Sequence, residues 1–140
     1  MIDVLNRQNK YPVDKKHFKG LLNRLIKHYD LKNPEIVLAF VSDMEIKKLN
    51  QKFLSKNRAT DVLSFPHDET SADGKFYMGD IIISTERAFE QSSEKPHSLK
   101  KELEILTIHG FLHLMGFQHL KGMEEEEDEI RNMILENGHE

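Results

Sequence analysis

The sequence predicts one α+β domain over residues 1–140, in which a small mixed sheet packs against helices around a central helix. The length of 140 residues and the hydrophobic fraction of 38% fit a single domain of common size. Strand-like and helix-like segments are mixed as far as residue 84 and only helix-like segments follow, an order typical of α+β proteins. The segment 103–117 is apolar on almost every side, so we expect this helix to be buried at the centre of the fold.

In the first half of the chain, each expected element has a local signal. Alternating apolar and polar side chains indicate the first strand. Asp14 stands where a helix N-cap is expected, and Ser42 with Glu45 has the pattern of a capping box. The expected elements are a strand over 2–8, a helix over 15–30, a buried strand over 35–41 and a helix from Ser42 to about Phe53.

In the second half, prolines, glycines and polar runs separate the elements. Pro96 interrupts the helical region, Ser98 is placed to cap the helix that follows, and Gly116 is placed to end it. The expected elements are a strand over 62–65, a turn-rich connection over 67–75, a strand over 76–84 antiparallel to the one before, and helices from about Ser84, from Ser98 and over 124–136.

The net charge of −4 is unevenly distributed along the chain. Residues 124–140 hold eight acids and one base, whereas residues 1–123 hold 19 bases and 16 acids, a net charge of +3. A basic body is compatible with a nucleic-acid partner but does not identify one. There is no cysteine, no signal pattern and no apolar run of membrane-spanning length. We therefore expect a cytoplasmic protein that has no membrane partner and binds any metal through histidine or carboxylate.

Three histidines, His109, His113 and His119, form the strongest chemical signal. His109 and His113 are four residues apart, so on a helix they project from one face. Gly116 lets the helix end, and His119 can then return to the same point. Two ligands from one helical turn and a third after a glycine turn leave open positions on the metal, which is typical of catalytic zinc. A single core histidine would be the simpler interpretation, but three buried imidazoles all need partners, and one metal ion satisfies them together.

The spacing of the three histidines is also that of the metzincin protease motif H-E-x-x-H-x-x-G-x-x-H. In those proteases the glutamate is the general base beside the metal. Position 110 of this chain is glycine. The spacing therefore favours a metal site, and Gly110 argues against proteolysis.

The segment His109-Gly-Phe-Leu-His-Leu-Met-Gly-Phe-Gln-His119 closely resembles the signature H-G-x-L-H-L-x-G-[FY]-D-H of the YbeY family of bacterial ribosomal-RNA maturation endoribonucleases. Residues 59–66 (ATDVLSFP) are similar to the family's P-T-D-V-L-S-F-P, and residues 78–81 (MGDI) to its L-G-D-I. The resemblance runs in order from about Ile36 through the acidic C-terminal segment.

The resemblance implies a compact α+β fold and one Zn²⁺ per chain on His109, His113 and His119. It also implies cleavage of single-stranded RNA, in maturation of the three-prime end of small-subunit rRNA and in ribosome quality control. Ribosomal proteins and an assembly GTPase are the partners that it suggests. His109 would then be catalytic as well as a ligand.

The chain departs from the family at a position that the resemblance assigns to catalysis. The family's L-N-x-x-[FY]-R pattern has an arginine where this chain has Leu54, and leucine cannot bind phosphate. Lys52, Lys56 or Arg58 in the same region is our candidate for binding RNA in its place. We prefer Arg58 for a catalytic role as well, because a guanidinium matches phosphate geometry better than an ammonium. Gln118 and Ala59 also differ from the family, and neither change removes a metal ligand.

Five further residues are candidates for a structural role or for a part in the site. Asp61 and Asp80 can be structural, by capping a turn or accepting backbone hydrogen bonds, or Asp80 can support a ligand histidine. His67 can lie on the surface or approach the site. Phe65 and Tyr77 can pack in the core or stack on bases.

Two other function classes remain open beside the nuclease. One is a ribosome-assembly RNA-binding module with a structural zinc, which Leu54 and a basic first helix favour. The other is a metalloprotease, which the histidine spacing favours and Gly110 opposes. The cleavage position, the attacking nucleophile, the native metal and the oligomeric state are not determined by the sequence.

Overall fold

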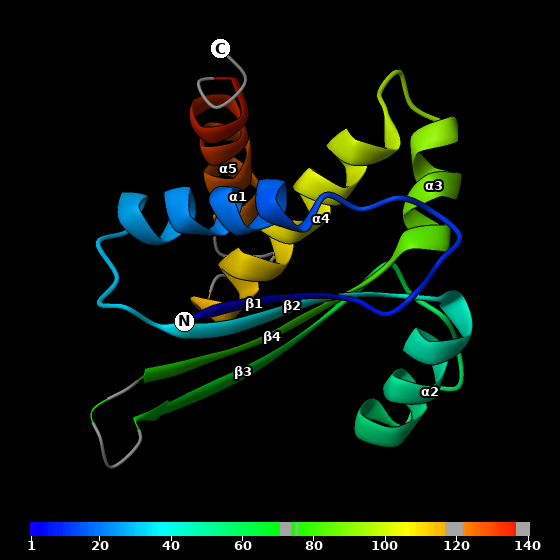
Figure 1. Ribbon diagram of the computed structural model, residues 1–140, viewed down its shortest axis with the longest axis horizontal. Helices are drawn as coiled ribbons and strands as arrows, with labels where there is room; N and C mark the ends of the chain where they lie inside the picture. Colours follow the sequence, from blue (N-terminus) through cyan, green and yellow to red (C-terminus); the bar gives the residue numbers. More distant parts are fainter. Residues whose placement is uncertain (71–73, 75, 117–121, 137–140) are drawn as a thin grey trace.

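The computed structural model describes residues 1–70, 74, 76–116 and 122–136. A four-stranded mixed sheet with the order β1-β2-β4-β3 forms its base (Figure 1). The three neighbours β1, β2 and β4 are parallel, and the edge strand β3 runs antiparallel to β4. The strands are β1 (Ile2–Asn6), β2 (Glu35–Val41), β3 (Val62–Thr70) and β4 (Phe76–Ser84).

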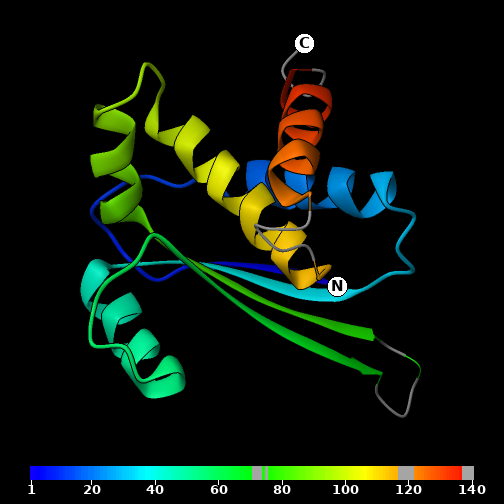
Figure 2. The ribbon, with the colours of Figure 1, turned by 180° about the vertical axis from the view of Figure 1, so that it is seen from behind.

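The helices are divided unequally between the two faces of the sheet. Four of them cover one face, and α2 lies on the other, as the two opposite views show (Figures 1 and 2). The helices are α1 (Lys15–His28), α2 (Asp43–Leu54), α3 (Thr85–Ser93), α4 (Leu99–Leu114) and α5 (Met123–Ile130), with a π-helical segment, Arg131–Glu136, after α5. A mixed sheet packed against helices on this pattern confirms the predicted α+β class.

Most helices begin at the caps that the sequence predicts. The Asp14 carboxylate accepts a hydrogen bond from the His17 amide at 3.3 Å, and the Ser42 hydroxyl accepts one from the Glu45 amide at 3.1 Å. The Ser98 hydroxyl caps α4 in the same way. Each side chain satisfies an amide that has no partner within its helix.

Two hydrophobic cores lie on the two faces of the sheet. The larger core lies beneath α1, α4 and α5, and contains Phe18, Phe40, Ile81 and Phe111. The smaller core lies beneath α2, around Ile46. Because alternate residues of a strand point to opposite faces, β2 and β4 supply side chains to both cores.

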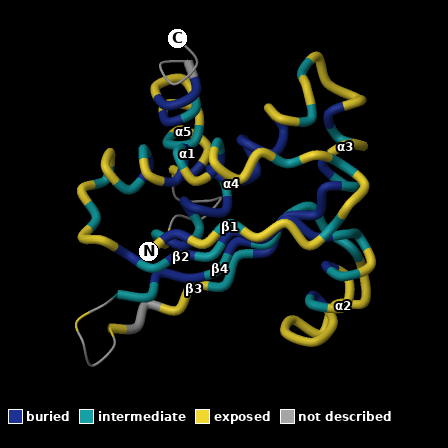
Figure 3. The backbone as a smooth tube through the Cα atoms, in the orientation of Figure 1, coloured by how far each residue is buried: buried dark blue, intermediate teal, exposed yellow. Residues whose placement is uncertain are grey.

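The helix α4 crosses the sheet at the centre of the larger core and is buried along most of its length (Figure 3). Gly116 follows the end of α4, as the sequence predicts. Its φ of +93° lies in the left-handed region, which glycine tolerates and which often ends a helix. The apolar pattern did not predict the burial of Glu104, which is 2% exposed. Its carboxylate lies 2.7 Å from the Nε2 atom of His17 on α1, so a polar partner accompanies the buried acid.

The prediction for residues 62–75 was wrong in one respect. The strand was expected to end at Phe65, but β3 continues through Pro66 to Thr70 and so occupies part of the expected turn. Pro66 lacks an amide hydrogen, yet it is tolerated because β3 is an edge strand whose register shifts between Pro66 and Glu69. Elsewhere the differences lie at element ends: β1 and α1 are each two residues shorter than expected. Over the described part of the chain, no helix is long and apolar enough to cross a membrane.

Candidate active site

The helix α4 brings two of the three predicted metal ligands together. The Nε2 atoms of His109 and His113 lie 3.2 Å apart, and their ring centroids are separated by 4.7 Å. Both side chains are partly exposed, in the C-terminal half of a helix whose residues from Glu102 onward are otherwise buried. The four-residue spacing therefore directs both rings to one point, as the sequence predicts. His119, the third predicted ligand, lies outside the described residues.

The carboxylate of Glu127 on α5 orients the first of these histidines. Its Oε2 atom lies 3.1 Å from Nδ1 of His109, and both side chains are largely buried, with 14% of Glu127 and 21% of His109 exposed. A carboxylate accepts only, so the ring nitrogen that faces it is the one that donates. A neutral His109 that donates from Nδ1 has its lone pair on Nε2, on the side of His113.

The donor set fits a tetrahedral metal such as zinc. Zinc–nitrogen bonds of about 2.0–2.1 Å at a tetrahedral angle separate two ligand atoms by roughly 3.3 Å. The observed separation of the His109 and His113 Nε2 atoms is 3.2 Å. Within residues 1–70, 74, 76–116 and 122–136, no group of three or more histidines, cysteines or acids is placed to hold a metal ion. The zinc site and its third ligand therefore remain predictions.

Close packing at Gly110 explains why the protease glutamate is missing. A Cβ atom built on Gly110 would lie 2.6 Å from Cγ2 of Ile81 and 3.2 Å from Oγ of Ser64. The Ser64 hydroxyl donates to the Gly110 carbonyl at 3.3 Å, which ties α4 to β3 at this point. A glutamate at position 110 would point its side chain into β4 rather than toward the histidines. The structure thus gives a packing reason for the residue that argues against proteolysis.

A cavity of about 400 Å³ opens in front of the two histidines. Its walls come from the start of β3 and the residues just before it, and it is lined by Thr60, Asp61, Val62, Leu63, Ser64, Pro66, His109 and His113. The side chain of Asp61 is used structurally, because it accepts from the Val62 amide at 2.8 Å and from the Gln91 amide group at 3.2 Å. The ATDVLSFP segment is therefore the wall that faces the histidines across the cavity.

The three basic candidates do not line this cavity. Lys52, Lys56 and Arg58 are all exposed, and none is among the lining residues. Arg58 is two residues from Thr60, and its carbonyl is held by the side-chain amide of Asn50 at 3.0 Å. Leu54, at the family's arginine position, is 47% exposed at the end of α2. The roles of the three cations in binding or catalysis remain predictions.

Asp80, Tyr77 and His67 form a cluster on the face of the sheet opposite α4. The carboxylate of Asp80 accepts from the Tyr77 hydroxyl at 2.5 Å and lies 3.1 Å from Nε2 of His67. Burial, and then the hydrogen bond to Asp80, raise the pKa of Tyr77 to about 12. Phe65 packs against the smaller core and meets Phe53 edge to face, with ring centroids 5.6 Å apart. Asp80 and His67 thus partner each other rather than the ligand histidines.

Sequence reasoning missed Glu127. The acidic run that contains it has five glutamates and an aspartate in succession, from Glu124 to Glu129. Spacing alone gave no means of choosing one of six acids. Docking of α5 selects two of them, since Glu126 accepts from the Tyr29 hydroxyl and Glu127 faces His109.

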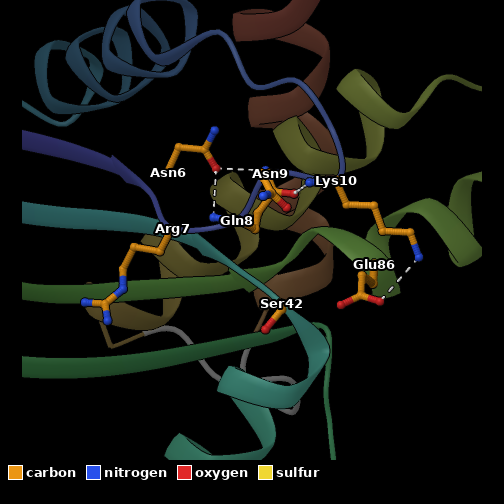
Figure 4. A pocket seen from close by; sticks show the side chains of 7 residues that line it. All are labelled: Asn6, Arg7, Gln8, Asn9, Lys10, Ser42 and Glu86. Atoms are coloured by element: carbon orange, nitrogen blue, oxygen red, sulfur yellow. Dashed lines mark hydrogen bonds and ion pairs between the residues drawn. The ribbon is translucent and has the colours of Figure 1, made fainter.

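A larger polar cavity, of about 560 Å³, lies at the ends of β1 and β2 (Figure 4). Its cations are already neutralised: Arg7 lies 3.2 Å from Glu45, and Lys10 lies 3.6 Å from Glu86. The side chain of Gln8 is used to fix the following turn, through the Lys10 and Tyr11 amides. We assign the chemistry to the histidine cavity, because two imidazoles converge there beside an orienting carboxylate.

Comparison with known proteins identifies the family of the chain. The model of the family described as "Endoribonuclease YbeY" matches residues 3–136. An "Endoribonuclease YbeY" from Finegoldia magna is 39% identical over 98% of this chain and 88% of its own length. Another, from Caldicellulosiruptor saccharolyticus, is 37% identical over 96% of this chain and 95% of its own.

A solved structure supports the fold as well. The solution structure of a Thermotoga maritima protein matches with a TM-score of 0.68 and 27% identity, and covers 99% of this chain and 92% of that one. Because the family model spans nearly the whole sequence and relatives above 30% identity match over most of their length, the chain belongs to the YbeY family of endoribonucleases.

Proposed function

We propose that the protein is a zinc-dependent endoribonuclease that cleaves single-stranded RNA during three-prime-end maturation of small-subunit rRNA. The observation that carries the proposal is the convergence of His109 and His113, with Nε2 atoms 3.2 Å apart, in front of a cavity. Membership of a family of endoribonucleases supports RNA as the substrate. We extend the proposal to ribosome quality control and a cytoplasmic location, with ribosomal proteins and an assembly GTPase as partners.

Each residue of the site has a part in the proposed chemistry. Zinc, held by His109, His113 and His119, would supply a Lewis acid for a phosphoryl oxygen and lower the pKa of water toward neutrality. Glu127 holds the Nδ1 proton of His109 and so keeps Nε2 available as a ligand.

The surroundings of the site would guide the RNA strand. The residues from Thr60 to Ser64 line the cavity in front of the histidines, where we propose that the strand lies. Lys52, Lys56 and Arg58 would attract the phosphates as the strand enters. Arg58, two residues from the cavity wall, is the cation that we propose to offset negative charge developing on the phosphate.

An RNA-binding module with a structural zinc is the second candidate function. The observation that favours it is the exposed leucine at position 54, where the family pattern has an arginine. Proteolysis is disfavoured, since the space beside Gly110 is filled by Ile81 and Ser64.

One experiment separates these functions. Metal in the purified protein is quantified, and cleavage of single-stranded RNA and of casein is measured for the wild type and for His109→Ala. His28→Ala serves as the matched control, because His28 is exposed on α1. We expect stoichiometric zinc and metal-dependent RNA cleavage, both lost in His109→Ala and both kept in the control. RNA cleavage by metal-free wild type at the full rate would refute the mechanism, and metal-dependent RNA binding without cleavage would favour the module.

A further inference from the structure

An apolar groove of about 280 Å³ lies on the face of the sheet opposite the histidines, between α2 and the strands β3 and β4. It is lined by Leu49, Phe53, Phe65, His67, Asp80 and Ile82. Phe53 forms one side and remains 57% exposed, although its ring packs edge to face against that of Phe65. Pockets that hold drug-sized ligands measure about 300–1,000 Å³, so this groove suits one small planar group.

Positive charge borders the groove. The ammonium group of Lys52 lies 5.3 Å from the centre of the ring of Phe53, which lines the groove. Lys56 and Arg58 are exposed in the segment that leads away from it. The one acid that lines the groove, Asp80, is held by the Tyr77 hydroxyl and by His67. An apolar aromatic groove beside exposed cations matches a flat base joined to a phosphate.

The edge strand β3 connects this groove to the histidine cavity. Phe65 and His67 line the groove, while Ser64 points to the opposite face and donates to the carbonyl of Gly110. Successive side chains of a strand point to opposite faces, so only the thickness of one edge strand separates the two sites. The segment 55–61, which carries Lys56 and Arg58, joins the helix of the groove to the wall of the histidine cavity.

We propose that this groove binds an unpaired base of the RNA strand that is cut at the histidine cavity, with the ring of Phe53 stacked on the base and Lys52 on the adjoining phosphate. The inference rests on the proposed function, since it takes RNA as the substrate. A protein segment is a less suitable occupant, because the exposed cations beside the groove complement the phosphates of RNA. An RNA strand that crosses β3 would place in this groove a base several nucleotides from the bond cleaved at the histidine cavity.

The test is equilibrium binding of a short fluorescein-labelled oligo(U) RNA, with a chelator present so that no cleavage occurs. Loss of a base–aromatic stack corresponds to about 5- to 150-fold weaker binding, which we expect for Phe53→Ala. Phe53→Trp should restore binding. Phe89→Ala is the matched control, because Phe89 is 43% exposed and stacks on Tyr11 with centroids 4.9 Å apart. It should bind RNA as the wild type does.

The salt dependence of binding tests the part assigned to Lys52. Each phosphate contact to a single strand contributes about 0.7 to the slope of log affinity against log salt, so Lys52→Ala should lower that slope by this amount. The matched control is Lys101→Ala, an exposed lysine on α4. An unchanged slope would overturn the phosphate contact.

The outcomes distinguish this inference from the proposed function. If Phe53→Ala binds oligo(U) as tightly as the wild type, the groove is not an RNA site, whether or not the wild type cleaves RNA. The groove is equally excluded as an RNA site if that variant keeps its affinity for oligo(U) and instead loses binding to a ribosomal protein. If Phe53→Ala loses affinity for oligo(U) while the wild type shows no metal-dependent cleavage, the groove is an RNA-binding site and the nuclease proposal fails. Thermal melting of each variant establishes that it folds.

Discussion

The contact between Glu127 and His109 makes the metal proposal quantitative. Replacing Glu127 with alanine removes the acceptor that lies 3.1 Å from Nδ1 of His109 and frees the ring to change tautomer. Both side chains are more than three-quarters buried, so water restores little of the lost interaction. Loss of such a supporting carboxylate typically weakens metal binding about 10- to 100-fold, or by roughly 1.4–2.7 kcal/mol. We expect Glu127→Ala to lie within this range.

Two further variants separate orientation of the ring from general effects of charge. Glu127→Gln keeps an oxygen that can accept from Nδ1 but loses the negative charge, so its zinc affinity should fall less than that of Glu127→Ala. Glu125→Ala removes an exposed acid from α5, two residues before Glu127, and is the matched control. Because Glu125 lies in the first turn of α5, the control also loses a favourable interaction with the helix dipole, worth about 0.3–1 kcal/mol of stability.

The assay is competition for zinc between each variant and a chromophoric chelator, which measures metal affinity independently of RNA cleavage. We expect the order wild type and Glu125→Ala, then Glu127→Gln, then Glu127→Ala. Equal zinc affinities for Glu127→Ala and Glu125→Ala would refute the assignment of Glu127 as the residue that positions His109.

Three further predictions concern other parts of the molecule. Leu54→Arg should raise affinity for single-stranded RNA and steepen its salt dependence by about 0.7, since the position is exposed, and unchanged titration curves would contradict this. Gly110→Ala should lower the free energy of unfolding in urea by up to about 2 kcal/mol, because the added methyl group would lie 2.6 Å from Ile81 and this overpacking outweighs the higher helix propensity of alanine. Adding Ile81→Val should recover part of the lost stability. A double variant as unstable as Gly110→Ala would argue against the clash. Tyr77→Phe should remove from the ultraviolet titration a phenol that ionises near pH 12. Because its pKa is raised in the folded state, Tyr77 stabilises the fold fully below pH 10 and loses this effect as pH rises through 12. If the substitution leaves stability below pH 10 unchanged, the hydrogen bond to Asp80 is contradicted.

Much of the fold was predictable because its signals are local. The caps at Asp14, Ser42 and Ser98 act within three residues, so the sequence places the starts of three helices. The end of β3 was not predictable in this way. Its extension past Pro66 depends on pairing with β4, and in the sequence a proline at an edge position looks the same as one that ends a strand.

For the candidate site too, local features were predictable from the sequence and contacts between distant elements were not. Two histidines four residues apart on a helix must share a face, and their convergence follows from helix geometry alone. The structure added the environment of α4: it showed that Gly110 is required by contact with Ile81, and that Asp80 belongs to a cluster on the far face. Neither fact has a counterpart in residue spacing, because each depends on which strand lies beneath which helix.

By itself, then, the sequence determined the α+β class, the helix starts and the pair of imidazoles on one helix face, since all of these depend on short-range periodicity and hydrogen bonding. Only the tertiary structure decided that Glu127 supports His109, that residues 60–64 form the facing wall, and that Phe53 and Phe65 border a groove across β3. These relations join elements far apart in the chain. They are set by the burial of apolar faces against one another, and that packing brings together residues whose separation in sequence carries no information about their contact.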